Sequence, residues 1–189
     1  MLAVTALRHG PLVIAWAHGA EARAAVLQGL LEHAGAPTDA VTHECPTCGS
    51  SEHGPLQASS GTVVLSLGHA GDLTAGVIAR AEAAASVGID VEALDAGRTP
   101  GTPLQDLTAL FAPAAPPTLR EWTIIEAAVK ADGRGLRIAP SDVVIDGARA
   151  HIPGRPPIDV ASVDAPAGYL ISVAIDPSHS SRPARGSDR

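Results

Sequence analysis

Short apolar runs separated by turn residues open the chain and predict a β-hairpin. The two runs cover residues 2–8 and 11–17, with a glycine and a proline between them. Over residues 21–33 the apolar positions take helical spacing, and Gly35 stands where a helix commonly ends in a left-handed glycine. Residues 36–61 hold several glycines and prolines and both cysteines, which predicts a long loop; such loops are usually functional or disordered.

The middle of the chain predicts three strands, at residues 62–67, 74–80 and 87–91. A glycine-containing turn over residues 68–72 is expected to join the first two strands. The third strand runs into acidic residues rather than into a cluster of turn residues.

The remaining pattern predicts two helices, over residues 104–111 and 118–132, followed by three strands. Thr118 and Glu121 form a capping-box pattern at the start of the second helix, and Gly133 lies just past its end. The three strands are expected at residues 142–146, 157–163 and 168–175.

A stretch rich in glycine and proline, residues 95–103, divides this pattern near its middle. Each side offers helix and strands in similar proportion, without a detectable sequence repeat. We therefore expect an α+β fold made of two halves, residues 1–98 and 99–176. Residues 177–189 lack the apolar content to pack and are expected to form a mobile tail.

Composition excludes several classes of protein. The 189 residues are 46% apolar and 17% charged, with a net charge of −7, which argues against a disordered chain and against a general nucleic-acid binder. No apolar run approaches the roughly 20 residues that span a bilayer. The N-terminus lacks the residue order of a signal peptide. Because two cysteines cannot build a disulfide framework, we expect a cytoplasmic protein.

Asp90 and Glu92 are the first candidates for chemistry. They lie two residues apart at the end of a predicted strand, so both side chains point to the same face. Paired carboxylates of this kind suit Mg²⁺, which takes one or two protein carboxylates together with water and phosphate oxygens. An ordinary solvated strand end would show the same two residues.

Glu126 and Lys130 form a second pair, four residues apart and therefore on one face of the predicted helix. A glutamate before a lysine at this spacing is also a common surface pair, worth about 0.2–0.5 kcal/mol. The surrounding residues are largely apolar, however, and a charged pair on a buried helix needs partners. Lys130 is also the one lysine among thirteen basic residues, the other twelve being arginine.

Two longer segments resemble a known family. Gly88-Ile-Asp-Val-Glu92 and the segment from Trp122 to Leu136, Trp-Thr-Ile-Ile-Glu-Ala-Ala-Val-Lys-Ala-Asp-Gly-Arg-Gly-Leu, look like the two signature motifs of Sfp-type 4′-phosphopantetheinyl transferases. The family pattern is Gly-(Ile/Val)-Asp-(Ile/Val)-Glu followed about 30–40 residues later by W-x-x-K-E-A-x-x-K-x-x-G-x-G-L. The loop around Cys45 and Cys48 is similar to one found in actinobacterial members.

The resemblance implies a fold of two similar α+β halves in a pseudo-twofold arrangement, with the active site in the cleft between them. It also implies transfer of 4′-phosphopantetheine from coenzyme A to a serine of an acyl or peptidyl carrier protein, in fatty-acid, polyketide or nonribosomal-peptide synthesis. Such an enzyme would work as a cytoplasmic monomer, without nucleic acid or membrane.

The same resemblance implies roles for individual residues. Mg²⁺ would be held by Asp90, Glu92 and Glu126, and Glu126 would be the base for the carrier serine. Lys130 would pair with the phosphates and stabilise the leaving group. The implied contacts to coenzyme A are His69, His53, Lys130 and, as the weakest of them, Arg23.

The chain departs from the family pattern at positions that bind phosphate. The two serines that flank the family's histidine are replaced by Gly68 and Ala70, and the first lysine of the helix motif is Ile125. Pro55 stands where the loop motif has a basic residue. Each lost charge-assisted bond is worth roughly 1.5–3 kcal/mol, so weaker binding of coenzyme A is expected.

Two other functions remain open. The departures fit a degenerate homologue that binds coenzyme A or a carrier protein without catalysing transfer. Alternatively, His43, Cys45, Cys48 and His53 supply donors for a zinc-binding interaction module, although no second cysteine pair exists and the histidine spacing matches no common zinc finger.

Overall fold

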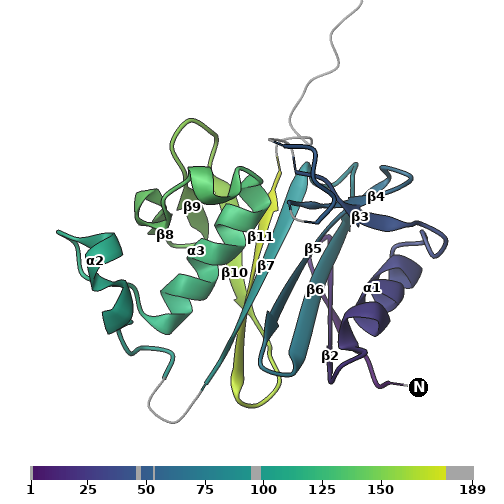
Figure 1. The fold of residues 1–189 in the computed structure, drawn as a ribbon, viewed down its shortest axis with the longest axis horizontal. Coiled ribbons are helices and arrows are strands. Elements are labelled where there is room, and N and C mark those ends of the chain that lie inside the picture. Colours follow the sequence, from purple (N-terminus) through teal and green to yellow (C-terminus); the bar gives the residue numbers. More distant parts are fainter. Residues whose placement is uncertain (1, 46–47, 53, 95–98, 178–189) are drawn as a thin grey trace, which may run out of the picture.

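The computed structural model describes residues 2–45, 48–52, 54–94 and 99–177. Two antiparallel sheets form the body of the molecule, and their strands run side by side between two helices (Figure 1). The first sheet has the strand order β1-β2-β6-β5. Its strands are β1 (Thr5–His9), β2 (Leu12–His18), β5 (Val63–Ala70) and β6 (Leu73–Arg80).

The second sheet has five strands in the order β7-β11-β10-β9-β8. They are β7 (Ser86–Ala93), β8 (Val144–Asp146), β9 (Arg149–His151), β10 (Ile158–Val163) and β11 (Tyr169–Asp176). A separate two-stranded hairpin is made of β3 (Val41–His43) and β4 (Leu56–Ala58). All strand pairs in the described residues are antiparallel.

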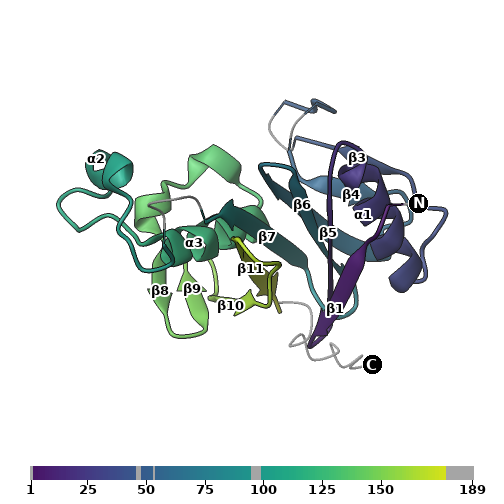
Figure 2. The same cartoon turned by 90° about the horizontal axis from the view of Figure 1, so that it is seen from below.

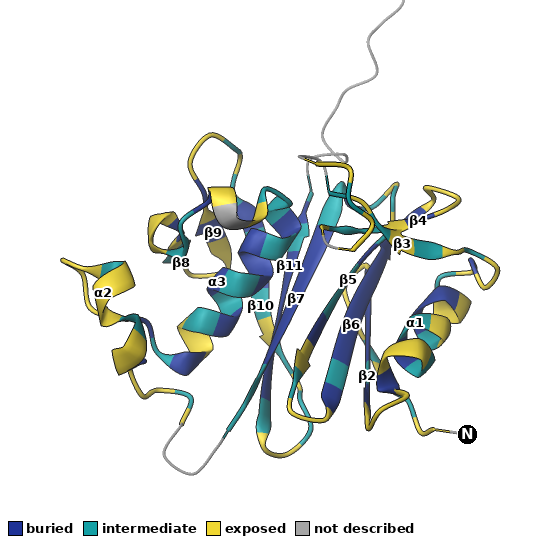
Figure 3. Cartoon of the chain, in the orientation of Figure 1, coloured by how far each residue is buried: buried dark blue, intermediate teal, exposed yellow. Residues whose placement is uncertain are grey.

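One long helix covers the outer face of each sheet, as Figures 1 and 2 show. Helix α1 (Ala22–His33) packs on the first sheet and α3 (Leu119–Asp132) on the second. The inner faces of the two sheets share one apolar core, to which Ile14 and Ile89 both belong. The burial of the central strands is visible in Figure 3. The remaining helical segments are short: η1 (Gln105–Leu107), α2 (Thr108–Phe111), η2 (Gly135–Arg137) and η3 (Pro140–Asp142).

β5 and β7 lie next to each other, although they belong to different sheets. Each is the edge strand of its sheet. A Cβ added at Gly68 on β5 would lie 3.3 Å from the carbonyl oxygen of Ile89 and 3.5 Å from the Cα of Asp90 on β7. We call this line of contact the β5–β7 seam. A side-chain hydrogen bond of 2.9 Å from the Tyr169 hydroxyl to Asp72 also connects the two sheets.

Helix α3 approaches β7 so closely that only glycine fits beneath it. A Cβ at Gly88 would lie 2.0 Å from the carbonyl oxygen of Ala127 and 2.6 Å from the amide nitrogen of Ala131. The start of α3 has the capping box expected from the sequence, since Thr118 and Glu121 bond each other's backbone amides. Gly133 ends the helix in the left-handed conformation.

A buried ion network ties the end of α3 to the second sheet. The Asp132 side chain, 1% exposed, accepts hydrogen bonds from Arg134 and Arg155, and Arg155 also bonds Asp176 at the end of β11. Burial would raise the pKa of Asp132, but the hydrogen bonds from the two arginines outweigh it and lower that pKa.

The fold class is confirmed as mixed α+β with antiparallel sheets and few helices. The first hairpin, α1, α3 and the strands after residue 156 follow the predicted pattern. The division of the chain into 1–98 and 99–176 stays a prediction; β7 precedes residue 99 yet pairs with β11 in the second sheet. Of the expected tail, 178–189 lies outside the described residues. None of the helices in the described part of the chain has the length and apolarity needed to cross a membrane.

Several local expectations were wrong. The turn expected over residues 68–72 is shorter, because β5 continues to Ala70 and only Gly71 and Asp72 turn. The expected loop at 36–61 contains the β3–β4 hairpin. The helix expected over 104–111 is a 3₁₀ turn followed by one short α-helical turn. The short strand β9 was not expected.

Replacing Gly88 by alanine is expected to lower the free energy of unfolding by roughly 2–3 kcal/mol, as overpacking does. The atoms that the new Cβ meets belong to the backbone of α3, so the helix must shift. Urea denaturation measures the loss. Gly101→Ala is the matched control, since nothing lies within 4 Å of its added Cβ. Equal stability of the two variants would contradict the close packing.

Asp132→Asn is expected to lower the free energy of unfolding by about 3 kcal/mol at pH 7, because it removes the buried negative charge that Arg134 and Arg155 share and leaves Arg155 with Asp176 alone. The folded pKa of Asp132 lies below the unfolded value of about 3.9. Its stabilisation is therefore complete above roughly pH 4 and is lost as the pH falls through the folded pKa. The variant should lack this part of the pH dependence. Asp159→Asn, at an exposed 3.6 Å ion pair with Arg149, is the control and should lose less than about 1 kcal/mol.

Candidate active site

The carboxylates of β7 lie on the side of the strand that faces α3. Gly88 packs against α3, and alternate residues of a strand share a face, so Asp90 and Glu92 point the same way. Asp90 is buried, with 8% exposure, whereas Glu92 is partly exposed near the end of the strand. The predicted strand therefore brings both side chains to one face.

Lys130, in the last turn of α3, contacts β7 directly. Its Nζ donates a hydrogen bond of 2.7 Å to Oδ1 of Asp90 and one of 3.0 Å to the carbonyl oxygen of Ile89. The lysine side chain is 32% exposed, so the ammonium lies between the buried carboxylate and solvent. The two sequence pairs, 40 residues apart, thus meet through this ion pair.

Asp90 has an incompletely satisfied carboxylate. Oδ2 of Asp90 is buried and has no hydrogen-bond partner. Burial raises the pKa of Asp90; the charge and hydrogen bond of Lys130 oppose that rise, and so do the backbone amide of Val91 and the charge of His69. A buried carboxylate oxygen without a donor is unfavourable, which makes this atom a candidate for a ligand.

Glu126 lies one helical turn before Lys130 and is partly buried. Burial raises the pKa of Glu126 most strongly; the negative charges of Asp90 and Glu92 raise it further, whereas Lys130 opposes the shift. Asp90 and Glu92 on β7 therefore both act electrostatically on Glu126 of α3. We call Asp90, Glu92, Glu126 and Lys130 the acid–lysine cluster.

The other residues predicted to contact coenzyme A do not all lie near the acid–lysine cluster. His69 is exposed near the end of β5, and its charge acts on Asp90 across the β5–β7 seam. Arg23 instead contacts His43 on the β3–β4 hairpin, with 3.1 Å between Arg23 Nη2 and His43 Nε2. His53 lies outside the described residues.

The cluster fits a divalent cation in its chemistry. Within the described residues, no three His, Cys, Asp or Glu side chains gather into a metal-holding group. Mg²⁺ commonly needs only one or two protein carboxylates, however, and keeps several waters. Oδ2 of Asp90 is an anionic oxygen left without a partner, which is the kind of ligand Mg²⁺ prefers. For the zinc alternative, Cys45 and Cys48 belong to no such group in the described part of the chain, and His53 is not described.

Two departures from the family pattern have packing causes. Gly68 lies at the seam, where a Cβ would be 3.4 Å from a methyl of Val91 and closer still to the backbone of β7. Ile125 is 4% exposed and belongs to the apolar core under α3. A Cβ at residue 68 would therefore make close contacts with β7, and the side chain at residue 125 contributes to the apolar core.

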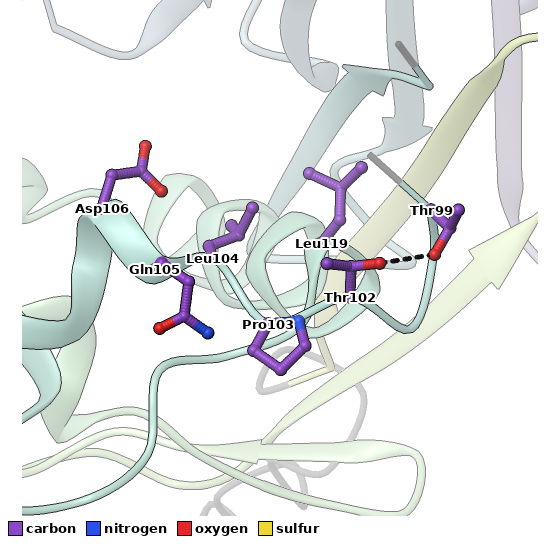
Figure 4. A pocket seen from close by; sticks show the side chains of 7 residues that line it. All are labelled: Thr99, Thr102, Pro103, Leu104, Gln105, Asp106 and Leu119. Carbon is purple, nitrogen blue, oxygen red and sulfur yellow. Dashed lines mark hydrogen bonds between the residues drawn. The ribbon is translucent and has the colours of Figure 1, made fainter. Parts of the chain in front are cut away.

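Two cavities in the described part of the chain lie away from the cluster. One, of about 250 Å³, is lined by the seven residues labelled in Figure 4, which are Thr99, Thr102, Pro103, Leu104, Gln105, Asp106 and Leu119. Thr99 and Thr102 bond each other there at 2.6 Å. Another, of about 540 Å³, opens between the two sheets near His9 and Ile175. Neither cavity is lined by a member of the acid–lysine cluster.

Sequence reasoning missed two parts of the site. The Ile89 carbonyl oxygen, which accepts from Lys130, is a backbone atom and leaves no signal in the residue pattern. Gly88 was noticed only as part of a motif, although its missing side chain lets α3 approach. A glycine inside a strand pattern, which marks a close backbone approach, was the available signal.

No family model matches the chain, and no curated protein matches it.

Glu126→Gln is expected to stabilise the metal-free protein at pH 7. Because the folded pKa of Glu126 is raised, its ionisation disfavours the folded state at pH values above the ordinary value of 4.5. The gain should vanish below that pH, where the carboxyl is protonated in both states. Thermal unfolding in EDTA at pH 7 and pH 4 measures both effects. A stability loss at pH 7 would contradict the crowding of acids around Glu126.

Proposed function

We propose that the chain is a Mg²⁺-dependent 4′-phosphopantetheinyl transferase of the Sfp type. It transfers 4′-phosphopantetheine from coenzyme A to a serine of an acyl or peptidyl carrier protein. Two antiparallel sheets, each covered by one long helix, support the pseudo-twofold arrangement of halves that belongs to this proposal. A cytoplasmic monomer acting without nucleic acid or membrane is part of the same proposal.

The contact between Lys130 and Asp90 carries the proposal. It joins the two motifs that resemble the family's signatures, and both residues are ones to which the resemblance gives a role. The pKa of Glu126 is raised by burial and then by the charges of Asp90 and Glu92, which supports assigning these acids to one site. Perturbed carboxylates gathered in this way are more common at functional sites than elsewhere.

The proposed reaction transfers the phosphopantetheine group from coenzyme A to a serine oxygen of the carrier protein. A new bond joins the serine Oγ to the phosphorus that carries pantetheine, the bond from that phosphorus to the bridging oxygen breaks, and 3′,5′-ADP leaves. A Glu126 carboxylate oxygen takes the serine proton, for which a raised pKa is suitable. Mg²⁺, held by Asp90, Glu92 and Glu126, supplies charge neutralisation at the pyrophosphate.

The cationic residues of the chain bind and orient coenzyme A in this proposal. Lys130 has a third ammonium proton beyond the two bonded to Asp90 and Ile89, and in this proposal that proton bonds a coenzyme A phosphate. His69, on the other side of the seam, binds a coenzyme A phosphate. Arg23 is assigned to coenzyme A more weakly, since it is engaged with His43, and His53 keeps the assignment that the resemblance implies.

A degenerate homologue that binds coenzyme A or a carrier without transfer is the second candidate. The apolar burial of Ile125 favours it, because that position holds a phosphate-binding lysine in the family pattern. Gly68 likewise offers no hydroxyl. The two candidates differ in catalysis, whereas both predict binding of a substrate.

Incubation with an apo-carrier protein, coenzyme A and Mg²⁺ is expected to add about 340 Da to the carrier by mass spectrometry. Glu126→Gln should lower the rate at least 100-fold, as loss of a general base does. Glu32→Gln, an isosteric change at an exposed site on α1, is the matched control and should keep the wild-type rate. Coenzyme A binding without any mass gain would favour the degenerate homologue.

A further inference from the structure

We infer that Lys130 bonds one oxygen of the Asp90 carboxylate, Oδ1, and so leaves the other, Oδ2, to bind a divalent cation. The bond between Lys130 and Oδ1 persists when the cation binds. Lys130 is then a positioning residue for the metal ligand as well as a phosphate contact. This inference rests on the proposed function, because it concerns the metal that the function requires.

The geometry fixes the ammonium on β7. Its two acceptors, Oδ1 of Asp90 and the carbonyl oxygen of Ile89, belong to neighbouring residues of one strand, at 2.7 and 3.0 Å. The backbone of α3 is itself fixed against β7 at Gly88. Both ends of the lysine side chain are therefore anchored, and the Asp90 carboxylate is held by one oxygen while the other has no partner.

Asp132 shows what arginine does to a carboxylate in the same protein. Arg134 covers both of its oxygens, with Nε 2.7 Å from Oδ2 and Nη2 2.8 Å from Oδ1. This is the usual two-pronged geometry of a guanidinium, whereas an ammonium acts as a point donor. The contrast between the two aspartates gives a physical reason for a lysine at position 130.

The composition of the chain agrees with this reason. Twelve of the thirteen basic residues are arginine, and the one lysine bonds the carboxylate whose Oδ2 has no hydrogen-bond partner. A guanidinium at residue 130 would complete the ion pair with Asp90 and leave no oxygen for a cation. The lysine leaves one of the two carboxylate oxygens without a hydrogen bond.

The single lysine also makes the inference testable in the unsubstituted protein. With ¹⁵N-labelled lysine, the full chain has one side-chain ammonium signal, that of Lys130. We expect a hydrogen-bonded signal that Asp90→Asn shifts and that persists at saturating Mg²⁺. Loss of the hydrogen-bonded signal on Mg²⁺ addition would show that the cation displaces the lysine, which overturns the inference.

Metal affinity separates positioning from charge. Removing a cation beside a metal site should strengthen binding of Mn²⁺ if Lys130 acts only by charge. If it positions Asp90, Lys130→Met and Lys130→Arg should both weaken Mn²⁺ binding about tenfold or more, as loss of residues that orient metal ligands does. Paramagnetic resonance titration with Mn²⁺ alone measures this. Arg120→Met, exposed on the same helix, is the control and should keep wild-type affinity.

Unchanged or tighter Mn²⁺ binding by both folded variants overturns the inference, as does a wild-type chain that binds no Mn²⁺. Where a variant fails to fold, as judged by circular dichroism, the ammonium signal of the wild-type chain decides. A chain that binds Mn²⁺ and keeps the lysine signal but transfers nothing to a carrier contradicts the proposed function alone, so the two failures are distinguishable.

Discussion

The approach of α3 to β7 at Gly88 is the constraint on which the acid–lysine cluster depends. The contact sets the distance between helix and strand, and it also sets their register, since Gly88 lies under the backbone of Ala127 and Ala131. A hydrogen bond from Ser86 to the Ala131 carbonyl adds a second point on the same line. With the register fixed, Lys130 lies over Asp90, and Glu126 is held near both acids of β7. A side chain at residue 88 would move all of these groups together.

Two aspartates with buried carboxylates, Asp90 on β7 and Asp132 at the C-terminal end of α3, illustrate opposite uses of charge. Asp132 is closed by Arg134 and Arg155, and its pKa is lowered, so it contributes to stability at neutral pH. Asp90 has one ion-pair partner and a raised pKa. In the same chain, both carboxylate oxygens of Asp132 accept hydrogen bonds from arginine, whereas Oδ2 of Asp90 accepts none. The missing hydrogen bond at Asp90 is therefore a local feature of the acid–lysine cluster.

Much of the fold follows from local pattern, and most of what failed involves contacts between distant residues. The capping box of Thr118 and the glycine at 133 predicted both ends of α3, because caps are local. The predicted turn began at Gly68, whereas the strand continues to Ala70. Gly68 lies close to the backbone of β7, and this close approach, not a turn, accounts for the glycine. Strands as short as β9 have too few residues to show alternation. The spacing predicted which charged side chains share a face, whereas the meeting of the two faces depends on tertiary packing.

The electrostatic state of the cluster bears on whether the departures at Gly68 and Ile125 imply loss of chemistry. Burial raises the pKa of both Asp90 and Glu126, so each ionised carboxylate disfavours the folded state. Apolar side chains in place of Asp90 and Glu126 would remove this unfavourable contribution to the free energy of folding, as replacement of buried ion pairs often does. Gly68 avoids a close contact at the seam and Ile125 is buried under α3, and neither residue belongs to the cluster. Carboxylates that are kept buried although their charge disfavours the folded state are more common at functional sites than elsewhere, which supports the proposed function over a structural role.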